Sequence, residues 1–204
     1  MSEFETNDGF DFIALIESLT EPDRLVLEGE RFCSDSNHKV AVQCFEKALT
    51  LGSTAALLNL AYMYRYGYGM TQSYPEALKH YKQAAHAGLA RAMYHLGTFY
   101  RNGYGVPVDY AEAVRWFRVG ADLGDQDCQN SLGLLYLNGK GVPQDPFEAF
   151  KLYRLAAEQG CGSAQYNLGW MYYNGQGIEK NDDQAQHWFK LAAEQTIHSP
   201  SPSF

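Results

Sequence analysis

Histidine and cysteine are the residue types of this 204-residue chain that could bind a metal or act in nucleophilic catalysis. No two histidines form a His-x-x-x-His pair, and none recurs with cysteine or aspartate at the spacing of a metal site. No nucleophile signature is visible either, so we expect no catalytic residue, metal or cofactor. The alternative is an enzyme whose catalytic residues lie far apart in the sequence. The histidines are His38, His80, His86, His95, His187 and His198.

Pairs of glycines separated by one residue recur four times and could suggest a phosphate-binding loop. A phosphate loop follows a β-strand and contains a third glycine or a Gly-Lys-Ser/Thr ending, and these pairs have neither. We predict instead that the first glycine of each pair ends a helix in the left-handed conformation. The pairs are Gly67 and Gly69, Gly103 and Gly105, Gly139 and Gly141, and Gly175 and Gly177.

Acidic residues that follow these loops could act as an acid–base pair, but their spacing favours a structural role. In each case a Ser, Asp or Asn is followed three residues later by Glu or Gln, which is the pattern of a capping box at a helix N-terminus. We therefore expect a helix to begin at each of these positions. The pairs are Ser73 and Glu76, Asp109 and Glu112, Asp145 and Glu148, and Asn181 and Gln184.

These motifs belong to a repeat of 36 residues. Four segments align without a gap: NLAYMYRYGYGM from Asn59, HLGTFYRNGYGV from His95, SLGLLYLNGKGV from Ser131 and NLGWMYYNGQGI from Asn167. Apolar and small residues recur at spacings of three and four on both sides of the glycine pair, which predicts two amphipathic helices per unit. The expected fold is an all-α solenoid of antiparallel helix hairpins.

The repeat also predicts the domain organisation. Four 36-residue units fill residues 53–196, and residues 24–52 form a divergent first hairpin with a shorter connection, whose apolar face includes Leu27 and Gly29. Residues 1–23 are an acidic segment in which residues 10–19 are a candidate capping helix for the open end of the solenoid. We expect residues 197–204 to be a disordered tail.

Charge and composition limit the classes of partner and the compartment. Of the net charge of −8, residues 1–23 carry −7, and the basic residues of the repeats are scattered, so we expect no nucleic-acid partner. No run of about 18 apolar residues predicts a membrane span. The N-terminus lacks the pattern of a secretory signal, and the four cysteines do not follow the repeat. We expect free thiols and a cytoplasmic location.

The order Leu-Gly-x-x-Tyr, Gly-x-Gly-Val, Asp, Ala-x-x-(Trp/Leu)-(Phe/Tyr) and Ala-Ala-x-x-Gly resembles the Sel-1-like repeat (SLR) family, a relative of the tetratricopeptide repeats. The resemblance covers residues 53–196 and implies a right-handed superhelix whose concave surface is lined by the first helix of each unit. It departs from the family pattern at Ala61, Gly120 and Thr196. Family members act mainly as adaptors and scaffolds for other proteins, and some are immunity proteins that neutralise bacterial toxins.

A minority of cysteine-rich relatives have been described as penicillin-binding or β-lactamase-like. Those relatives carry pairs of cysteines eight residues apart. Here the residues eight positions before Cys128 and Cys161 are Gly120 and Tyr153, so neither cysteine has the expected partner. The resemblance therefore gives an enzymatic function no specific support.

Aromatic residues and arginines on the predicted concave face are the candidate binding residues. The tyrosines that recur with the repeat, such as Tyr64 and Tyr100, belong to the predicted core and are not candidates. Projecting the groove positions of tetratricopeptide repeats onto this chain selects a different set, rich in the residue types of interface hot spots. The set is Tyr62, Arg65, Tyr66, Arg91, Tyr94, Arg101, Tyr166, Trp170 and Tyr173.

These residues lead to three functional hypotheses. The first is an adaptor or scaffold that binds a protein or peptide on the concave face, and the second is an immunity-type inhibitor of one toxin. A β-lactam-binding enzyme is the third. For the aromatic residues themselves, the alternative to partner binding is packing between neighbouring units.

Overall fold

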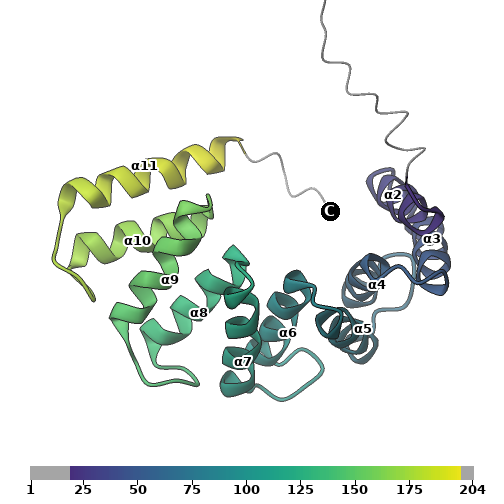
Figure 1. The fold of residues 1–204 in the computed structure, drawn as a ribbon, viewed down its shortest axis with the longest axis horizontal. Coiled ribbons are helices and arrows are strands. Elements are labelled where there is room, and N and C mark those ends of the chain that lie inside the picture. Colours follow the sequence, from purple (N-terminus) through teal and green to yellow (C-terminus); the bar gives the residue numbers. More distant parts are fainter. Residues whose placement is uncertain (1–18, 199–204) are drawn as a thin grey trace, which may run out of the picture.

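A computed structural model describes residues 19–198, with side chains as far as residue 195, and it forms an open arc of helices (Figure 1). All regular structure in this range is α-helical, which confirms the predicted all-α solenoid of helix hairpins. The helices are α2 (Glu21–Ser34), α3 (His38–Thr50), α4 (Ala55–Tyr66), α5 (Tyr74–His86), α6 (Ala90–Asn102), α7 (Tyr110–Asp122), α8 (Gln126–Asn138), α9 (Pro146–Glu158), α10 (Gly162–Asn174) and α11 (Asp182–His198).

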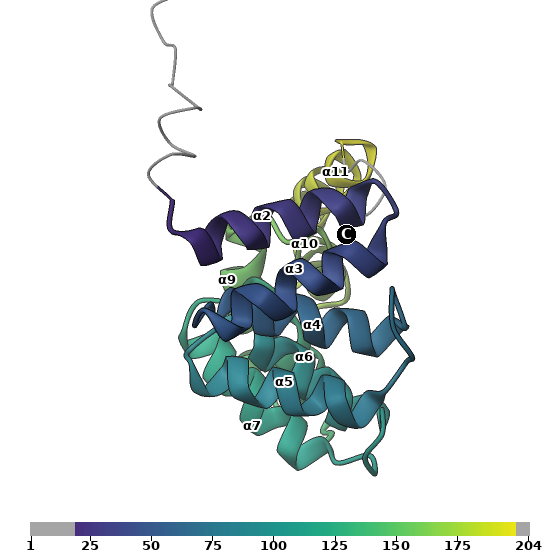
Figure 2. The same cartoon turned by 90° about the vertical axis from the view of Figure 1, so that its right-hand side faces the viewer.

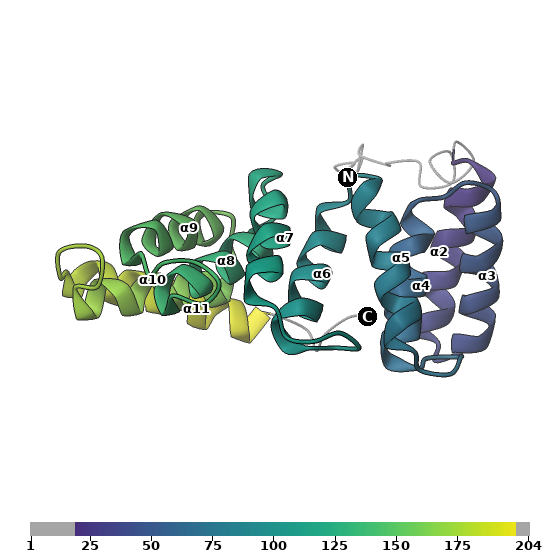
Figure 3. The same ribbon diagram turned by 90° about the horizontal axis from the view of Figure 1, so that it is seen from below.

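Consecutive helices pair into hairpins, and the hairpins stack in chain order (Figures 2 and 3). The first helices α2, α4 and α6 lie nearer the inside of the arc than their partners α3, α5 and α7 (Figure 1). Because each hairpin packs mainly on its neighbours in sequence, the inner surface is built from the first helix of successive units.

Two predicted boundaries were wrong by a few residues. The first hairpin begins at Glu21 and not at residue 24, because Pro22 suits the first turn of a helix and the acidic Glu21 and Asp23 favour its N-terminal end. At the other end, α11 continues to His198, two residues into the predicted tail. The candidate capping helix, apart from Leu19, and the tail from residue 199 lie outside the described residues.

Each hairpin holds an aromatic ring of its second helix against a small residue of its first helix. A Cβ atom added to Gly97 would lie 2.5 Å from the ring of Phe117. The absence of a side chain at this position therefore makes room for the ring. The equivalent pairs are Gly29 and Phe45, Gly133 and Tyr153, and Gly169 and Phe189; Ala61 and Tyr81 occupy the same positions of the second hairpin.

Burial along the repeat matches the predicted core with one exception. The tyrosines Tyr64, Tyr100, Tyr136 and Tyr172 are partly buried and pack against the core clusters, as predicted. In the first hairpin, however, Leu27 is 48% exposed, and Val26 and Gly29 are the buried residues of α2. Val26 belongs to a core cluster with residues of α3 and α4.

The two glycines of each loop have different tasks. Gly139 ends α8 in the left-handed conformation, with φ of 64°, as predicted. Gly141, with φ of 74°, lies against the preceding unit: a Cβ atom there would be 2.4 Å from the carbonyl oxygen of Tyr110, the first residue of α7. Gly69 and Gly177 approach the backbone of His38 and Pro146 in the same way, and Gly105 approaches the side chain of Tyr74. The second glycine therefore joins one unit to the one before it.

Only one of the two hydrogen bonds of each predicted capping box forms. The side chain of Asp109 accepts a hydrogen bond from the backbone N–H of Glu112 at 2.9 Å, and Ser73, Asp145 and Asn181 accept in the same way. The reciprocal half is absent because the backbone N–H of Asp109 donates to the carbonyl of Tyr100 at 2.9 Å. The Glu112 carboxylate instead pairs with Arg115 at 3.0 Å. The repeated tyrosine thus anchors the start of the second helix through its backbone.

Candidate functional site

The inner face of the N-terminal half carries a groove of about 820 Å³ between α2, α4 and α6. We call it the tyrosine–arginine groove, because four tyrosines and three arginines are among its sixteen lining residues. Its aromatic and charged side chains come from three successive units, so the stacking of the hairpins forms it. They include Glu30, Arg31, His38, Tyr62, Arg65, Tyr66, Tyr68, Arg91, Tyr94 and His95.

Three tyrosines form a cluster at the end of α4 and in the loop that follows. The ring centroids of Tyr62 and Tyr66 are 4.5 Å apart, and those of Tyr66 and Tyr68 are 5.7 Å apart. Burial is the main cause that raises the pKa of Tyr62, so this phenol stays neutral. Tyr66 remains 44% exposed. The cluster therefore offers a broad, uncharged aromatic surface to a ligand in the groove.

The arginines of the groove are held against aromatic rings. The guanidinium of Arg65 lies 5.0 Å from the ring centroid of Tyr66 and 5.6 Å from that of Phe99. Arg91 lies 5.3 Å from the ring centroid of Tyr94 and pairs with Asp127 of the next unit. A guanidinium whose face is stacked still has its edges free to donate hydrogen bonds. These contacts hold two cations in defined positions on the inner face.

His95 lies beside these arginines and is kept neutral. Its ring stacks on Tyr81 at a centroid distance of 4.7 Å, and its Nδ1 atom is buried without a hydrogen-bond partner. Burial lowers the pKa of His95 to about 3, with further contributions from Arg91 and Arg65. His95 is therefore a poor proton acceptor near neutral pH and adds no charge to the groove.

The lowered pKa of His95 predicts a loss of stability in acid. Below pH 6.5 the unfolded chain binds a proton at this histidine and the folded protein does not, so protonation favours unfolding down to about pH 3. Each pH unit in this window costs about 1.4 kcal/mol. Asparagine occupies the equivalent positions 59 and 167. Urea denaturation from pH 7 to 4 should therefore show a shallower loss of stability for His95→Asn. Equal slopes would contradict the burial of a neutral His95.

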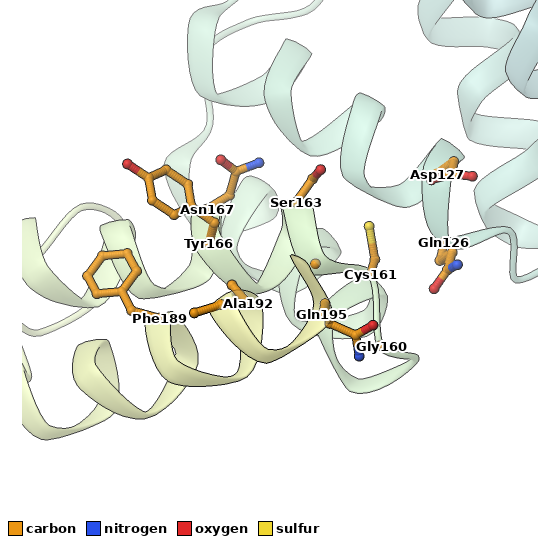
Figure 4. A pocket seen from close by; sticks show the side chains of 12 residues that line it. Gln126, Asp127, Gly160, Cys161, Ser163, Tyr166, Asn167, Phe189, Ala192 and Gln195 are labelled. Carbon is orange, nitrogen blue, oxygen red and sulfur yellow. The ribbon is translucent and has the colours of Figure 1, made fainter. Parts of the chain in front are cut away.

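A second groove, of about 1090 Å³, lies at the C-terminal end of the inner face between α8, α10 and α11 (Figure 4). The rings of Tyr166 and Phe189 form one wall, with centroids 5.4 Å apart. Cys161 lies at the start of α10, and burial raises the pKa of its thiol. Asp127 also lines this groove, and its negative charge raises the pKa of the Cys161 thiol further, which keeps the thiol protonated.

The structure brings five of the nine predicted binding residues together. Tyr62, Arg65, Tyr66, Arg91 and Tyr94 all line the tyrosine–arginine groove, and Tyr166 lines the C-terminal groove. The other three line neither groove. Trp170 and Tyr173 are 41% and 55% exposed on α10, and Arg101 is half-buried with its guanidinium 5.7 Å from the ring centroid of Phe117.

Arg31, His38 and Tyr68 are among the residues of the tyrosine–arginine groove that were not predicted. Arg31 and His38 belong to the first hairpin, where the shorter loop prevented alignment with the groove positions of the other units. Tyr68 lies between two loop glycines, outside the helix positions from which the binding residues were selected. The signal that could have found it is the large side chain between these glycines, which recurs as Tyr104, Lys140 and Gln176.

The described residues offer little support for other kinds of site. Between residues 19 and 198, no group of three His, Cys, Asp or Glu side chains could hold a metal ion. Cys33, Cys44, Cys128 and Cys161 are all free thiols. Within the same range, none of the helices has the length and apolar character needed to cross a membrane.

Comparison with known proteins identifies the repeat. The family description "Sel1 repeat" matches five consecutive segments, residues 26–53, 54–89, 90–125, 126–161 and 162–196. The first of these is the divergent hairpin, so the family match extends beyond the four units that resembled the family in sequence. No curated protein matches the chain.

Three of the similar solved structures show the extent of the likeness. A Sel1 repeat protein from Oxalobacter formigenes is 33% identical, with 85% of this chain and 71% of that chain covered and a TM-score of 0.79. A protective antigen of uropathogenic Escherichia coli is 38% identical, with 76% of this chain but 33% of that chain covered and a TM-score of 0.72. An immunity protein from Pseudomonas aeruginosa is 26% identical over 87% of this chain and 66% of that chain, with a TM-score of 0.60. The chain therefore belongs to the Sel1 repeat family.

Proposed function

We propose that this protein is an adaptor or scaffold that binds a protein or peptide on the inner face of its solenoid, and that it acts in the cytoplasm. The observation that carries the proposal is the tyrosine–arginine groove. Its tyrosines and arginines are the residue types that contribute most to binding energy at protein interfaces. Contacts with neighbouring residues already hold these side chains in position. The side chains would therefore lose little conformational freedom when a ligand binds.

An immunity-type function is the second candidate, and the similarity to the Pseudomonas aeruginosa immunity protein is the observation that favours it. Both functions require a bound protein, but they differ in the number of partners. A scaffold should bind several proteins, whereas an immunity protein should form a one-to-one complex with one toxin. Affinity purification from the native cell, followed by mass spectrometry, distinguishes the two.

We expect the double substitution Tyr66→Ala and Trp170→Ala to weaken partner binding by at least about 2 kcal/mol, or roughly 30-fold in Kd. Both residues lie on inner helices and are exposed, by 44% and 41%, so the fold should tolerate their loss. Tyr94 is less suitable because it also packs against His95 and Phe117. Binding of the partners recovered with the unaltered protein is the measurement.

Phe147→Ala is the matched control. Phe147 is 55% exposed on α9, a second helix of its hairpin, and lies outside both grooves. Circular dichroism and the melting temperature should be the same for all three proteins. If the folded double variant recovers its partners as well as the Phe147→Ala variant does, the inner face is not the binding surface.

A further inference from the structure

Charge is divided unequally between the N-terminal segment and the tyrosine–arginine groove. Residues 1–18 contain five acidic residues, no lysine or arginine, and phenylalanine at positions 4, 10 and 12. The groove is lined by three arginines, Arg31, Arg65 and Arg91, and by one acidic residue, Glu30, while Arg91 also pairs with Asp127 of the next unit. Three arginines therefore face two carboxylates. The chain as a whole has a net charge of −8, so this excess of positive charge is local.

The groove is also chemically matched to such a segment. Arg65 and Arg91 stack on the rings of Tyr66 and Tyr94, and their edges can donate to carboxylates. The neighbouring tyrosines offer a surface on which phenylalanine rings can pack. Arg31 is exposed at the last turn of α2 and is the arginine of the groove nearest in sequence to the N-terminal segment.

Residues 1–18 are long enough to reach the groove. They join the described chain just before α2, which begins at Glu21, and Arg31 lies ten residues further along this helix. Ten residues of α-helix correspond to about 15 Å. Eighteen residues in an extended conformation span up to roughly 60 Å. The segment can therefore turn back along α2 and still cross the inner faces of α4 and α6.

We propose that residues 1–18 bind in the tyrosine–arginine groove of the same chain, with their carboxylates on Arg31, Arg65 and Arg91. The segment then competes with any partner of that groove, and a partner that displaces it is an acidic peptide segment with aromatic side chains. This second statement rests on the proposed function. The binding of residues 1–18 in the groove does not rest on the proposed function, because it requires no partner.

Photo-crosslinking in the full chain tests the occupancy. A photoreactive phenylalanine analogue, p-benzoylphenylalanine, replaces Phe10, and crosslinked peptides are mapped by mass spectrometry after protease digestion. We expect crosslinks within one chain to residues 62–68 of α4 and its loop, or to residues 91–95 of α6. Raising the salt concentration from 0.05 to 0.5 M should lower their yield severalfold, because salt screens the pairing of charges.

Two charge reversals give a matched comparison. Arg31→Glu should lower the yield of these crosslinks at least about fivefold. Arg115→Glu makes the same change of charge on α7, where the side chain is 78% exposed and outside both grooves, and should leave the yield unchanged. Replacing the five Asp and Glu residues of residues 1–18 by Asn and Gln should lower the crosslink yield as Arg31→Glu does, and it leaves the groove residues unchanged.

Three results would overturn the proposal: crosslinks mainly to α3, α5 or α7, crosslinks mainly between two chains, or equal yields in the Arg31→Glu and Arg115→Glu proteins. The outcome is independent of the test with Tyr66→Ala and Trp170→Ala. If that double variant loses its partners while no groove crosslink forms, only the occupancy by residues 1–18 fails. If groove crosslinks form while partner capture is unaffected by the double substitution, the proposed function fails instead.

Discussion

Leu132→Ala should lower the free energy of unfolding by about 2 to 5 kcal/mol. Leu132 is 3% exposed on α8, in the middle of the array, and belongs to the core cluster that spans the second, third and fourth hairpins. Truncation of its side chain leaves a cavity in this cluster. Urea denaturation followed by circular dichroism measures the loss.

Leu134 provides the control within the same helix. It is the same residue type two positions away, but it is 40% exposed. Leu134→Ala should therefore cost less than about 1 kcal/mol, as surface substitutions usually do. Similar denaturation midpoints for the two variants would show that α8 does not pack with the face assigned to it.

Gly141→Ala should lower the free energy of unfolding by roughly 2 to 6 kcal/mol, which is similar to the effect of Leu132→Ala. A left-handed conformation costs a residue with a side chain about 1 to 3 kcal/mol, and overpacking adds about as much. The added Cβ atom would lie 2.4 Å from the carbonyl oxygen of Tyr110, so the loop and α7 would have to separate. Thermal and urea denaturation measure the effect.

Gly124→Ala separates the two contributions. Gly124 also has a positive φ, of 89°, but a Cβ atom there would meet nothing within 4 Å. This variant should show only the conformational cost, and the difference from Gly141→Ala measures the contact between units. If the two variants are equally stable, the second glycine is required only for its backbone conformation.

The fold could be predicted from the sequence because the repeat presents each signal four times. Asp109 marks the start of α7 and Gly139 marks the end of α8, and the apolar spacing of each helix agrees with these boundaries. Local and tertiary preferences therefore agree. The errors lie where the repeat ends. Glu21–Asp23 and Ile197–His198 have no counterpart in neighbouring units, and only the packed structure shows that they continue a helix.

The site was harder to predict because it depends on how neighbouring units stack. The groove positions of tetratricopeptide repeats, projected onto this chain, were enough to select Tyr62, Arg65 and Tyr94. This projection does not show that Arg91 crosses to Asp127 of the next unit, or that Tyr173 lines neither groove. Nor does it show that half of each capping box is replaced by a hydrogen bond to a tyrosine carbonyl, because that acceptor lies nine residues earlier.

The contact between the second loop glycine and the preceding unit also determines how such a chain can change in length. The same glycine position meets the start of the preceding second helix in all four loops. An in-frame duplication of 36 residues would therefore create only joints that the protein already contains. An insertion of another length within a unit would displace a glycine from its neighbour and leave a core face without its partner. Whole units are thus the natural step by which this inner surface lengthens or shortens.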